Sequence, residues 1–375
     1  MFRPEKLTLA REFRIRTKKS LAEAIGTSSS NLTKWEAGDH KPEEKHLFDL
    51  AWALDFPVSW FLLDSEVGST GQRHRSLKST LKRQKQRMTA ALSLMDSLAS
   101  CLNEYVDFPE VELPGGHWKS SGEISDAEVL SMALETRRHF GFGLGPAGDI
   151  VDGLESNGVL VARCEVGGTK IDGVSAWANI CHHPLVLLAT DKANAARSRF
   201  DAAHELGHLV LHRNVREMDF DTDEEMQAEF DLQERQADLF ASEFLLPAEA
   251  FISEVRLAHL DEFADLKLKW RASVKMMITK ASKLKLIDKD YATELYIFYN
   301  ARGWNRGEPH DDIMAFEQPE TVRSALDYLA KDNPAFLHHV EAQSGLNTQL
   351  LSELFQFEAP ITPNSNVLPM RRKSA

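Results

Sequence analysis

Apolar residues recur every three or four positions along most of this 375-residue chain, a spacing that predicts amphipathic helices. In residues 1–66 the pattern is interrupted by Gly26, Gly38, Pro42 and Pro57, which are typical of helix ends and starts. We predict helices here at 5–16, 18–25, 29–37, 43–54 and 58–63. Two of them meet at a tight turn around Gly26, as in a helix-turn-helix, whose second helix lies in the DNA major groove.

The period changes in the middle of the chain. After a predicted helix at 126–141, three short runs rich in Val, Ile and Leu predict a small antiparallel sheet, with strands at 159–166, 172–179 and 184–190. An uninterrupted helix at 197–212 follows, and a second, long helix ends at Pro247. Helical periodicity then continues at 257–270, 273–284, 289–300, 317–331 and 333–356.

These patterns divide the chain into modules, as expected for a length beyond a single core. We predict a head at 1–66, a basic linker and helix at 67–122, an α+β domain at 123–250, a helical region at 251–358 and a disordered tail at 359–375. The pair at 257–270 and 273–284 also has helix-turn-helix spacing, but its apolar positions pack equally well against a neighbouring helix.

Charge is distributed unevenly. The net charge is −13, yet residues 1–90 carry 17 Lys and Arg residues against 11 Asp and Glu residues, whereas the remainder carries 27 against 46. A basic head on an acidic body indicates that the head alone contacts phosphate. From Arg73 to Arg87 seven basic residues occur with no acid among them. This run either contacts the DNA backbone or forms the solvated face of a helix reaching Leu102, and both interpretations remain open.

The composition indicates a cytoplasmic protein. The sequence has no apolar run of about 18 residues and no export leader, so we expect no membrane partner. Its three cysteines, Cys101, Cys164 and Cys181, are widely separated and odd in number, which fits a reducing compartment. His182 and His183 follow Cys181, but three consecutive side chains cannot easily converge on one metal ion.

The helix at 197–212 contains the pattern H-E-x-x-H at His204, Glu205 and His208. Residues four apart leave the same face of a helix, so both imidazoles can reach one zinc ion. Glu205 can then act as the general base of a metalloprotease. The alternative is an amphipathic helix with exposed histidines; the apolar flank from Leu206 to Leu211 and the absence of proline argue against it.

A catalytic zinc ion needs a third protein ligand. His212 lies one further turn along the same helix, about 6 Å from His208 along the axis, and is therefore better placed for packing or for supporting a ligand. Glu234 shares the inward face of the following helix with Ala237 and Ala241, and a carboxylate on a packing face needs a partner such as zinc. Lesser candidates are Glu224, Glu225, Glu229 and Glu243.

Two segments in the head carry a family resemblance. Residues 17–26, Thr-Lys-Lys-Ser-Leu-Ala-Glu-Ala-Ile-Gly, and residues 28–38, Ser-Ser-Ser-Asn-Leu-Thr-Lys-Trp-Glu-Ala-Gly, resemble the Cro/C1-type (XRE) helix-turn-helix family. The resemblance implies DNA-facing side chains at Lys18, Ser29, Ser30, Asn31 and Lys34. Lys18 stands where that family usually has Gln, so the operator cannot be inferred. A helical docking domain that binds no DNA is the alternative.

The segment from Arg199 to His212, followed by Glu234-Arg-Gln-Ala-Asp and the run to Pro247, resembles the ImmA/IrrE family of metallo-endopeptidases. The resemblance implies a Zn²⁺ ion on His204, His208 and Glu234, with Glu205 as base. Gln236 stands where a second acid is common in that family. The expected fold is multidomain and mainly α, with an all-α helix-turn-helix head, a zincin-like α+β protease domain with a small antiparallel sheet, and a helical C-terminal region.

We therefore predict a DNA-binding transcriptional regulator with a zinc metallo-endopeptidase domain. The resemblance implies a protein substrate, a transcriptional repressor whose cleavage relieves repression in a stress or mobile-element response. A sheet edge can bind an extended peptide through main-chain hydrogen bonds. The competing hypothesis is a transcription factor whose metallopeptidase-like domain senses zinc or a metabolite without proteolysis. Whether the chain forms a homodimer is left open by the sequence.

Overall fold

The computed structural model describes residues 1–64, 68, 79–168, 171–191, 194–215, 222–332, 336–355 and 371–372. The chain forms two compact units, each discontinuous in sequence. Unit 1 contains Met1–Val111, Gly158–Asp191 and Pro319–Ala375, and unit 2 contains Glu112–Asn157 and Lys192–Gln318. The basic residues predicted at 73–78 and most of the tail predicted at 359–375 lie outside the described residues.

The head of unit 1 has the predicted helices, with boundaries set by local capping. They are α1 (Pro4–Phe13), α2 (Lys18–Ala24), α3 (Ser29–Ala37), α4 (Glu44–Leu54) and the 3-10 turn η1 (Val58–Phe61). Thr17 and Ser20 form a reciprocal capping box at the start of α2. Ser28 caps α3, which ends at Gly38 in a left-handed conformation with φ of 78°. Leu21 and Leu32 are fully buried where α2 and α3 meet.

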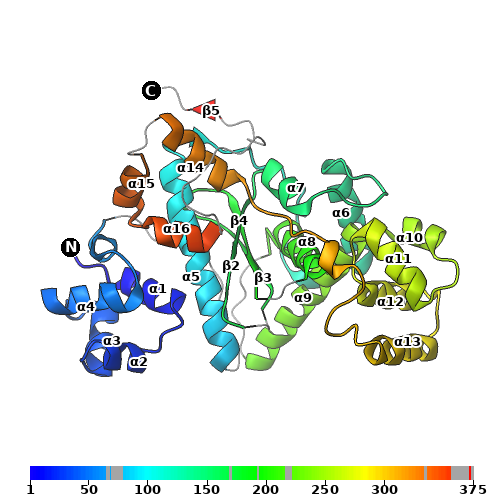
Figure 1. The fold of residues 1–375 in the computed structure, drawn as a ribbon, viewed down its shortest axis with the longest axis horizontal. Helices are drawn as coiled ribbons and strands as arrows, with labels where there is room; N and C mark the ends of the chain where they lie inside the picture. Colours follow the sequence, from blue (N-terminus) through cyan, green and yellow to red (C-terminus); the bar gives the residue numbers. More distant parts are fainter. Residues whose placement is uncertain are drawn as a thin grey trace. The chain divides into compact units, whose positions relative to one another are not determined.

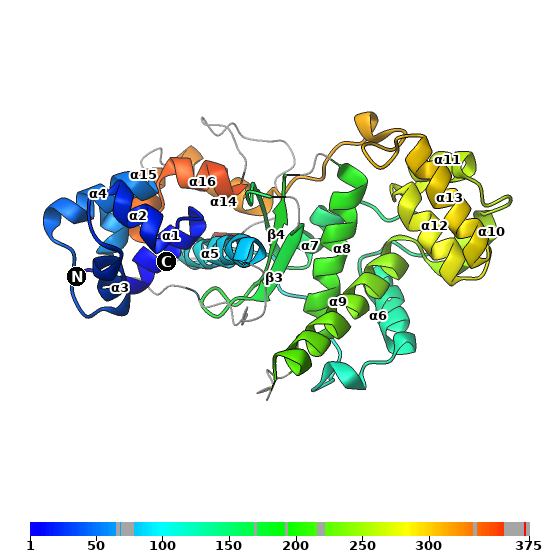
Figure 2. The ribbon, with the colours of Figure 1, turned by 90° about the horizontal axis from the view of Figure 1, so that it is seen from below.

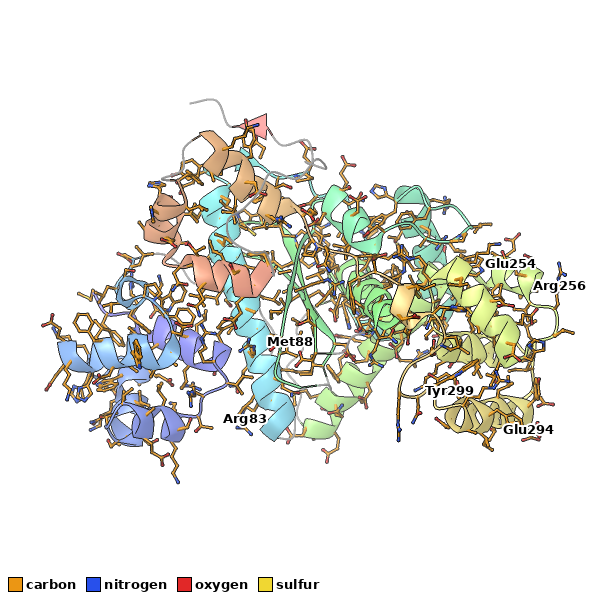
Figure 3. The ribbon with its side chains drawn as sticks, viewed as in Figure 1. Arg83, Met88, Glu254, Arg256, Glu294 and Tyr299 are labelled. Carbon is orange, nitrogen blue, oxygen red and sulfur yellow. The ribbon has the colours of Figure 1, made fainter. Side chains whose placement is uncertain are left out.

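Helix α5 (Ser79–Leu102) is the central helix of unit 1 (Figures 1 and 3). It packs against α1 and α15 as well as β3 and β4, and side chains such as Met88 are fully buried. The basic run therefore has two environments. Arg83 is exposed, whereas Arg87 is only 9% exposed and donates hydrogen bonds to the carbonyl oxygens of Phe13 and Glu165, at 2.6 and 2.8 Å. Arg87 is therefore neither exposed for contact with the DNA backbone nor part of a solvated helix face.

The sheet of unit 1 differs from the antiparallel one predicted. Its strands are β2 (Leu160–Cys164), β3 (Gly173–Trp177) and β4 (Pro184–Ala189), in the order β2-β4-β3. β4 pairs antiparallel with β3 but parallel with β2, so the sheet is mixed and the prediction was wrong for the second pair. The connection from β2 to β3 must cross two strand spacings, about 10 Å, because β4 inserts between them.

The burial of β4 gives the physical reason for the difference. Residues 185–188 are all fully buried, in a continuous apolar run. Such a run is typical of a central strand covered on both faces, not of a strand in a one-sided antiparallel sheet. The pairing partner of each strand is a tertiary property, which the alternation of apolar residues does not reveal.

The C-terminal part of unit 1 consists of α14 (Thr321–Asp332), α15 (Phe336–Ser344) and α16 (Thr348–Phe355). α15 packs on α5, and α16 packs on β2. The single helix predicted at 333–356 is divided at Gly345, whose φ is 75°, and Asn347 caps the new helix through the backbone N–H of Leu350. Arg371–Arg372 form the short strand β5, which pairs with β1 (Val106–Asp107). A single hydrophobic core joins the head, α5, the sheet and these helices.

Unit 2 is built around a pair of helices, α8 (Ala195–Leu211) and α9 (Asp223–Leu245). They are accompanied by η2 (Ser121–Glu123), α6 (Asp126–His139) and α7 (Ile150–Ser156). α8 and α9 approach closely at Gly207, where an added Cβ would lie 3.1 Å from Cδ1 of Phe240 and 3.3 Å from Cα of Ala237. The glycine inside the H-E-x-x-H pattern thus allows close packing of the two helices.

The remainder of unit 2 is helical, as predicted. It comprises α10 (Ala248–Glu254), α11 (Leu260–Trp270), α12 (Val274–Lys283), α13 (Lys289–Ala301) and the 3-10 turn η3 (Asp311–Ile313). Lys267 of α11 is fully buried and pairs with Glu308 at 2.9 Å. Glu308 also accepts a hydrogen bond from the hydroxyl of Tyr299, which is labelled on α13 in Figure 3. In the described part of the chain, no helix is both long and apolar enough to cross a membrane.

Candidate metal centre and DNA-binding surface

Helix α8 positions the two histidines of the H-E-x-x-H pattern. Asn194 caps its N-terminus by accepting a hydrogen bond from the backbone N–H of Arg197 at 2.8 Å. One side of the helix is anchored by buried apolar residues, Leu206, Leu209, Val210 and Leu211. His204 and His208 lie one turn apart, with side chains 14% and 21% exposed. The helix is therefore fixed by its apolar side while both imidazoles remain partly accessible.

Helix α9 brings Glu234 to the same place. The Nε2 atoms of His204 and His208 are 3.1 Å apart, and each lies 3.5 Å from a different carboxylate oxygen of Glu234. These three residues form a cluster whose ligand atoms all lie within 4.8 Å of one another. Glu243, one of the lesser candidates for third ligand, instead pairs with Lys280 at 2.5 Å.

The spacing of these three atoms fits a zinc ion. Bonds of 2.0–2.1 Å in tetrahedral geometry place neighbouring ligand atoms about 3.3 Å apart. The distances of 3.1 and 3.5 Å lie on either side of that value. Two imidazoles and one carboxylate are also a donor set that suits catalytic zinc. The residues present thus fit the metal, although their role as ligands remains a prediction.

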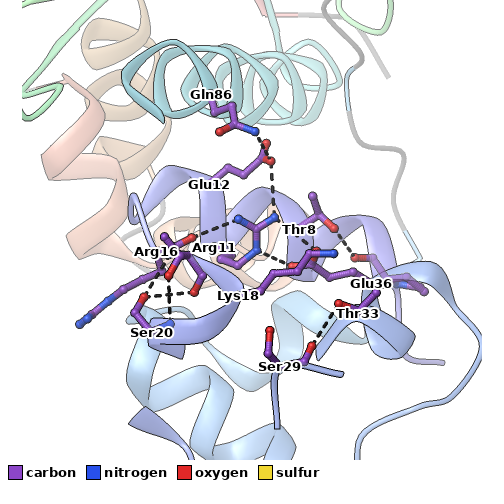
Figure 4. Close-up of polar contacts among 12 residues, drawn as sticks. Thr8, Arg11, Glu12, Arg16, Lys18, Ser20, Ser29, Thr33, Glu36 and Gln86 are labelled. Atoms are coloured by element: carbon purple, nitrogen blue, oxygen red, sulfur yellow. Dashed lines mark hydrogen bonds and ion pairs between the residues drawn. The ribbon is translucent and has the colours of Figure 1, made fainter. Parts of the chain in front are cut away.

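The surface predicted to bind DNA is the exposed side of α3. Ser29, Ser30, Asn31 and Lys34 are all exposed there. Lys18 differs, because its ammonium lies 3.0 Å from Glu36, which also pairs with Arg11 (Figure 4). Part of its charge is thus compensated within the head.

The head is also tied to the rest of unit 1 by polar contacts. Gln86 of α5 donates a hydrogen bond to Glu12 of α1 at 2.8 Å (Figure 4). Arg14, one residue beyond α1, pairs with Glu353 of α16 at 2.6 Å. These contacts hold the helix-turn-helix in a fixed position on α5 and α16.

Comparisons with known families agree with this arrangement. Residues 9–61 match the helix-turn-helix family, and residues 154–282 match a peptidase family described as the IrrE N-terminal-like domain. The chain joins a helix-turn-helix to an IrrE-like domain. No protein in the curated set matches it. The matched IrrE-like segment contains β2, β3 and β4, both helices α8 and α9, and all three residues of the cluster.

In the IrrE-like domain, further side chains contact the Nδ1 atoms of His204 and His208, on the side of each ring away from Glu234. Nδ1 of His204 lies 2.9 Å from Oδ1 of Asp238, and Nδ1 of His208 lies 3.0 Å from Nδ1 of His212. His212 thus contacts His208 instead of the cluster itself. Asp238 was not predicted from the sequence, although its spacing of four residues from Glu234 places both on one face of α9.

The electrostatics of the cluster follow from burial and from these contacts. Burial alone would lower the pKa of His204, but hydrogen bonds with Asp238 and Glu234, together with the charge of Glu205, raise it to about 10. Burial would raise the pKa of Glu234, yet the neighbouring imidazoles of His204 and His208 hold it well below its usual range. The carboxylate of Glu234 therefore stays ionised, as a metal ligand requires.

Glu205 is well enclosed, with only 6% of its surface exposed. Its negative charge is one of the causes that raise the pKa of His204. A general base must lie within reach of the water or the group that it deprotonates. The position of Glu205 beside the cluster is compatible with that role.

Proposed function

We propose that the protein is a DNA-binding regulator that carries a zinc endopeptidase. The observation that supports this most directly is the convergence of His204, His208 and Glu234 at ligand spacing, beside Glu205, within an IrrE-like domain. The helix-turn-helix in the same chain supports a role in gene regulation. The domain boundaries at 66, 122, 250 and 358 remain part of this proposal.

The proposed chemistry is hydrolysis of a peptide bond. Zinc held by the three ligands would supply Lewis acidity to the scissile carbonyl. Glu205 accepts a proton from the attacking water and transfers it to the leaving amine. Asp238 and His212 keep the two imidazoles oriented with Nε2 toward Glu234, so that the ligand set is formed before substrate arrives.

We propose a transcriptional repressor as the natural substrate, cleaved to release the genes it silences. The head supports this, because a protease linked to a DNA-binding domain is concentrated where repressors are bound. A peptide substrate must be extended for its scissile bond to be exposed.

Substitution of Glu205 tests the mechanism. We expect Glu205→Gln to retain zinc, measured by metal analysis of the purified protein, and to lose cleavage. Glu249→Gln, at an exposed position on α10, is the matched control and should keep both properties. Cleavage that survives in Glu205→Gln would overturn the assigned role of Glu205.

Substrate identification separates the peptidase from a zinc or metabolite sensor. Peptides that appear in cells expressing wild type, and are absent with Glu205→Gln, can be identified by mass spectrometry. We expect fragments of a DNA-binding repressor among them. If wild type and Glu205→Gln give the same peptides, while zinc changes the DNA affinity of both, the peptidase hypothesis is rejected in favour of a zinc sensor.

A further inference from the structure

A chain of three hydrogen-bonding groups extends from His208 into the interior of unit 2. Nδ1 of His208 lies 3.0 Å from Nδ1 of His212, and Nε2 of His212 lies 3.0 Å from Oε1 of Gln236. Gln236, on α9, is fully buried. Its amide nitrogen donates to the carbonyl oxygens of Ser121 and Ile124, both at 2.9 Å. The chain thus ends on main-chain groups whose hydrogen-bonding roles cannot change.

The orientation of the Gln236 amide follows from these two carbonyls. A carbonyl oxygen can only accept, so the amide NH₂ group must face them and donate both of its hydrogens. Turning the amide over would place Oε1 against two carbonyl oxygens, so both hydrogen bonds that the amide donates would be lost, at a cost of about 1–3 kcal/mol for each buried group left unsatisfied. Oε1 of Gln236 is therefore directed at His212 and can only accept.

The fixed amide determines where hydrogen sits on both imidazoles. Because Oε1 of Gln236 only accepts, Nε2 of His212 must carry a hydrogen and donate it. Both contacts of His212 are neutral groups, an amide and an imidazole, so a positive charge on His212 would lack compensation. Neutral His212 then offers a lone pair at Nδ1, and Nδ1 of His208 donates to it. This leaves the lone pair of His208 on Nε2, the atom that faces Glu234.

We propose that Gln236 is a positioning residue that sets the tautomer of His208 through His212. A metal ligand needs its lone pair directed at the ion, and the group on the other ring nitrogen decides which tautomer is present. The two rings are held by different groups. Asp238 accepts from His204 directly and carries a charge, whereas the relay behind His208 is uncharged and anchored to main-chain carbonyls. The inference rests on the proposed metal site.

The tautomer can be measured without any peptidase activity. In the full-length, metal-free chain labelled with ¹⁵N-histidine, long-range ¹H–¹⁵N correlations at about pH 8, above the ordinary pKa of histidine, report which ring nitrogen is protonated. We expect hydrogen on Nδ1 of His208 and on Nε2 of His212. Hydrogen on Nε2 of His208 in the wild type would overturn the proposal.

Three variants test the relay. Gln236→Met removes the acceptor, so we expect a mixture of His208 tautomers and a zinc Kd raised about 10- to 100-fold, measured by competition with a chelator. His212→Leu should do the same. His212→Asn places an oxygen acceptor near the position of Nδ1 and should restore the His208 tautomer and most of the zinc affinity. Circular dichroism identifies any variant that fails to fold.

The outcomes distinguish the relay from the function on which it rests. Unchanged tautomer and zinc affinity in folded Gln236→Met would reject the relay and leave the metal site intact. If wild type binds no zinc, the metal site itself is rejected. If zinc binds and the tautomers are as expected but no peptide is cleaved, the peptidase is rejected while the relay stands.

Discussion

The carboxylate of Asp238 lies 2.9 Å from Nδ1 of His204, on the opposite side of the imidazole from Glu234. A charged acceptor there increases the electron density on Nε2 and fixes the ring. We expect Asp238→Asn to weaken zinc binding by about 10- to 100-fold while preserving the fold. Chelator competition measures the effect, and Asp231→Asn, exposed on the same helix, is the control and should bind zinc as wild type does.

Because α8 and α9 pack closely at Gly207, we expect a larger side chain at this position of the H-E-x-x-H pattern to be destabilising. The 3.1 and 3.3 Å distances around an added Cβ leave room for alanine only if Phe240 shifts by a few tenths of an ångström. We expect Gly207→Val to lower the free energy of unfolding by about 1–3 kcal/mol and to weaken zinc binding, because α8 and α9 must separate. Gly307→Val is the control, since nothing lies within 4 Å of a Cβ there.

The exposed side of α3 predicts a salt-dependent interaction with DNA. Because the operator is unknown, affinity for a non-specific duplex over a series of salt concentrations is the direct measurement. Lys34→Glu should weaken binding and reduce the slope of log K against log salt by about 0.9 for a lost phosphate contact. Lys331→Glu, exposed on α14 of the same unit, should leave the slope unchanged. Equal slopes for Lys34→Glu and wild type would favour a docking role.

The same measurement of DNA affinity against salt concentration tests whether Arg83, in the exposed part of the basic run, contacts DNA. Arg83 lines a small surface pocket together with Arg16 and Thr17 (its position on α5 is labelled in Figure 3). Seen from below in Figure 2, α2, α3 and the start of α5 face the same side of unit 1. We expect Arg83→Glu to reduce the salt slope as Lys34→Glu does. A slope equal to that of wild type would assign Arg83 to the solvated face of α5.

Burial of Lys6 is expected to make the free energy of unfolding depend on pH. Its ammonium is fully buried, 4.5 Å above the ring of Trp60, and burial lowers its pKa to about 8. Between pH 8 and 10.5 the unfolded chain holds more protons at this residue than the folded one, so stability rises with pH in that window. In Lys6→Met this residue no longer titrates, so its contribution to the pH dependence is lost. Its stability relative to wild type should therefore fall by on the order of 3 kcal/mol between pH 7 and pH 11, measured by denaturant unfolding.

Features set by neighbouring residues were predictable from the sequence. The boundaries of α2 and α3 depend on Thr17, Ser28 and Gly38, whose caps and left-handed turn are local. The spacing of His204 and His208 is fixed by the helix, and Glu234 could be chosen because it shares a face with apolar residues. These elements need no knowledge of the tertiary structure, which is why pattern and propensity were sufficient for them.

Features set by distant residues were not predictable. β4 lies between strands that precede it in the sequence, and Arg87 finds its acceptors in Phe13 and Glu165, which are 74 and 78 positions away. The division of the chain into discontinuous units has the same origin. Asp238 was visible in principle, as the residue four positions after Glu234, but an exposed acid on a helix has many roles and its contact with His204 depends on how α8 and α9 pack.

The pairing of Arg14 and Arg87 with Glu353 has a consequence for the order in which the protein is made. Glu353 lies on α16, near the end of the chain, whereas Arg14 belongs to the head. Since synthesis proceeds from the N-terminus, the ribosome must complete all of unit 2 and α16 before the head finds its last partners. The part that would recognise DNA is therefore translated first, but a nascent or truncated chain that lacks α16 also lacks both ion pairs with Glu353.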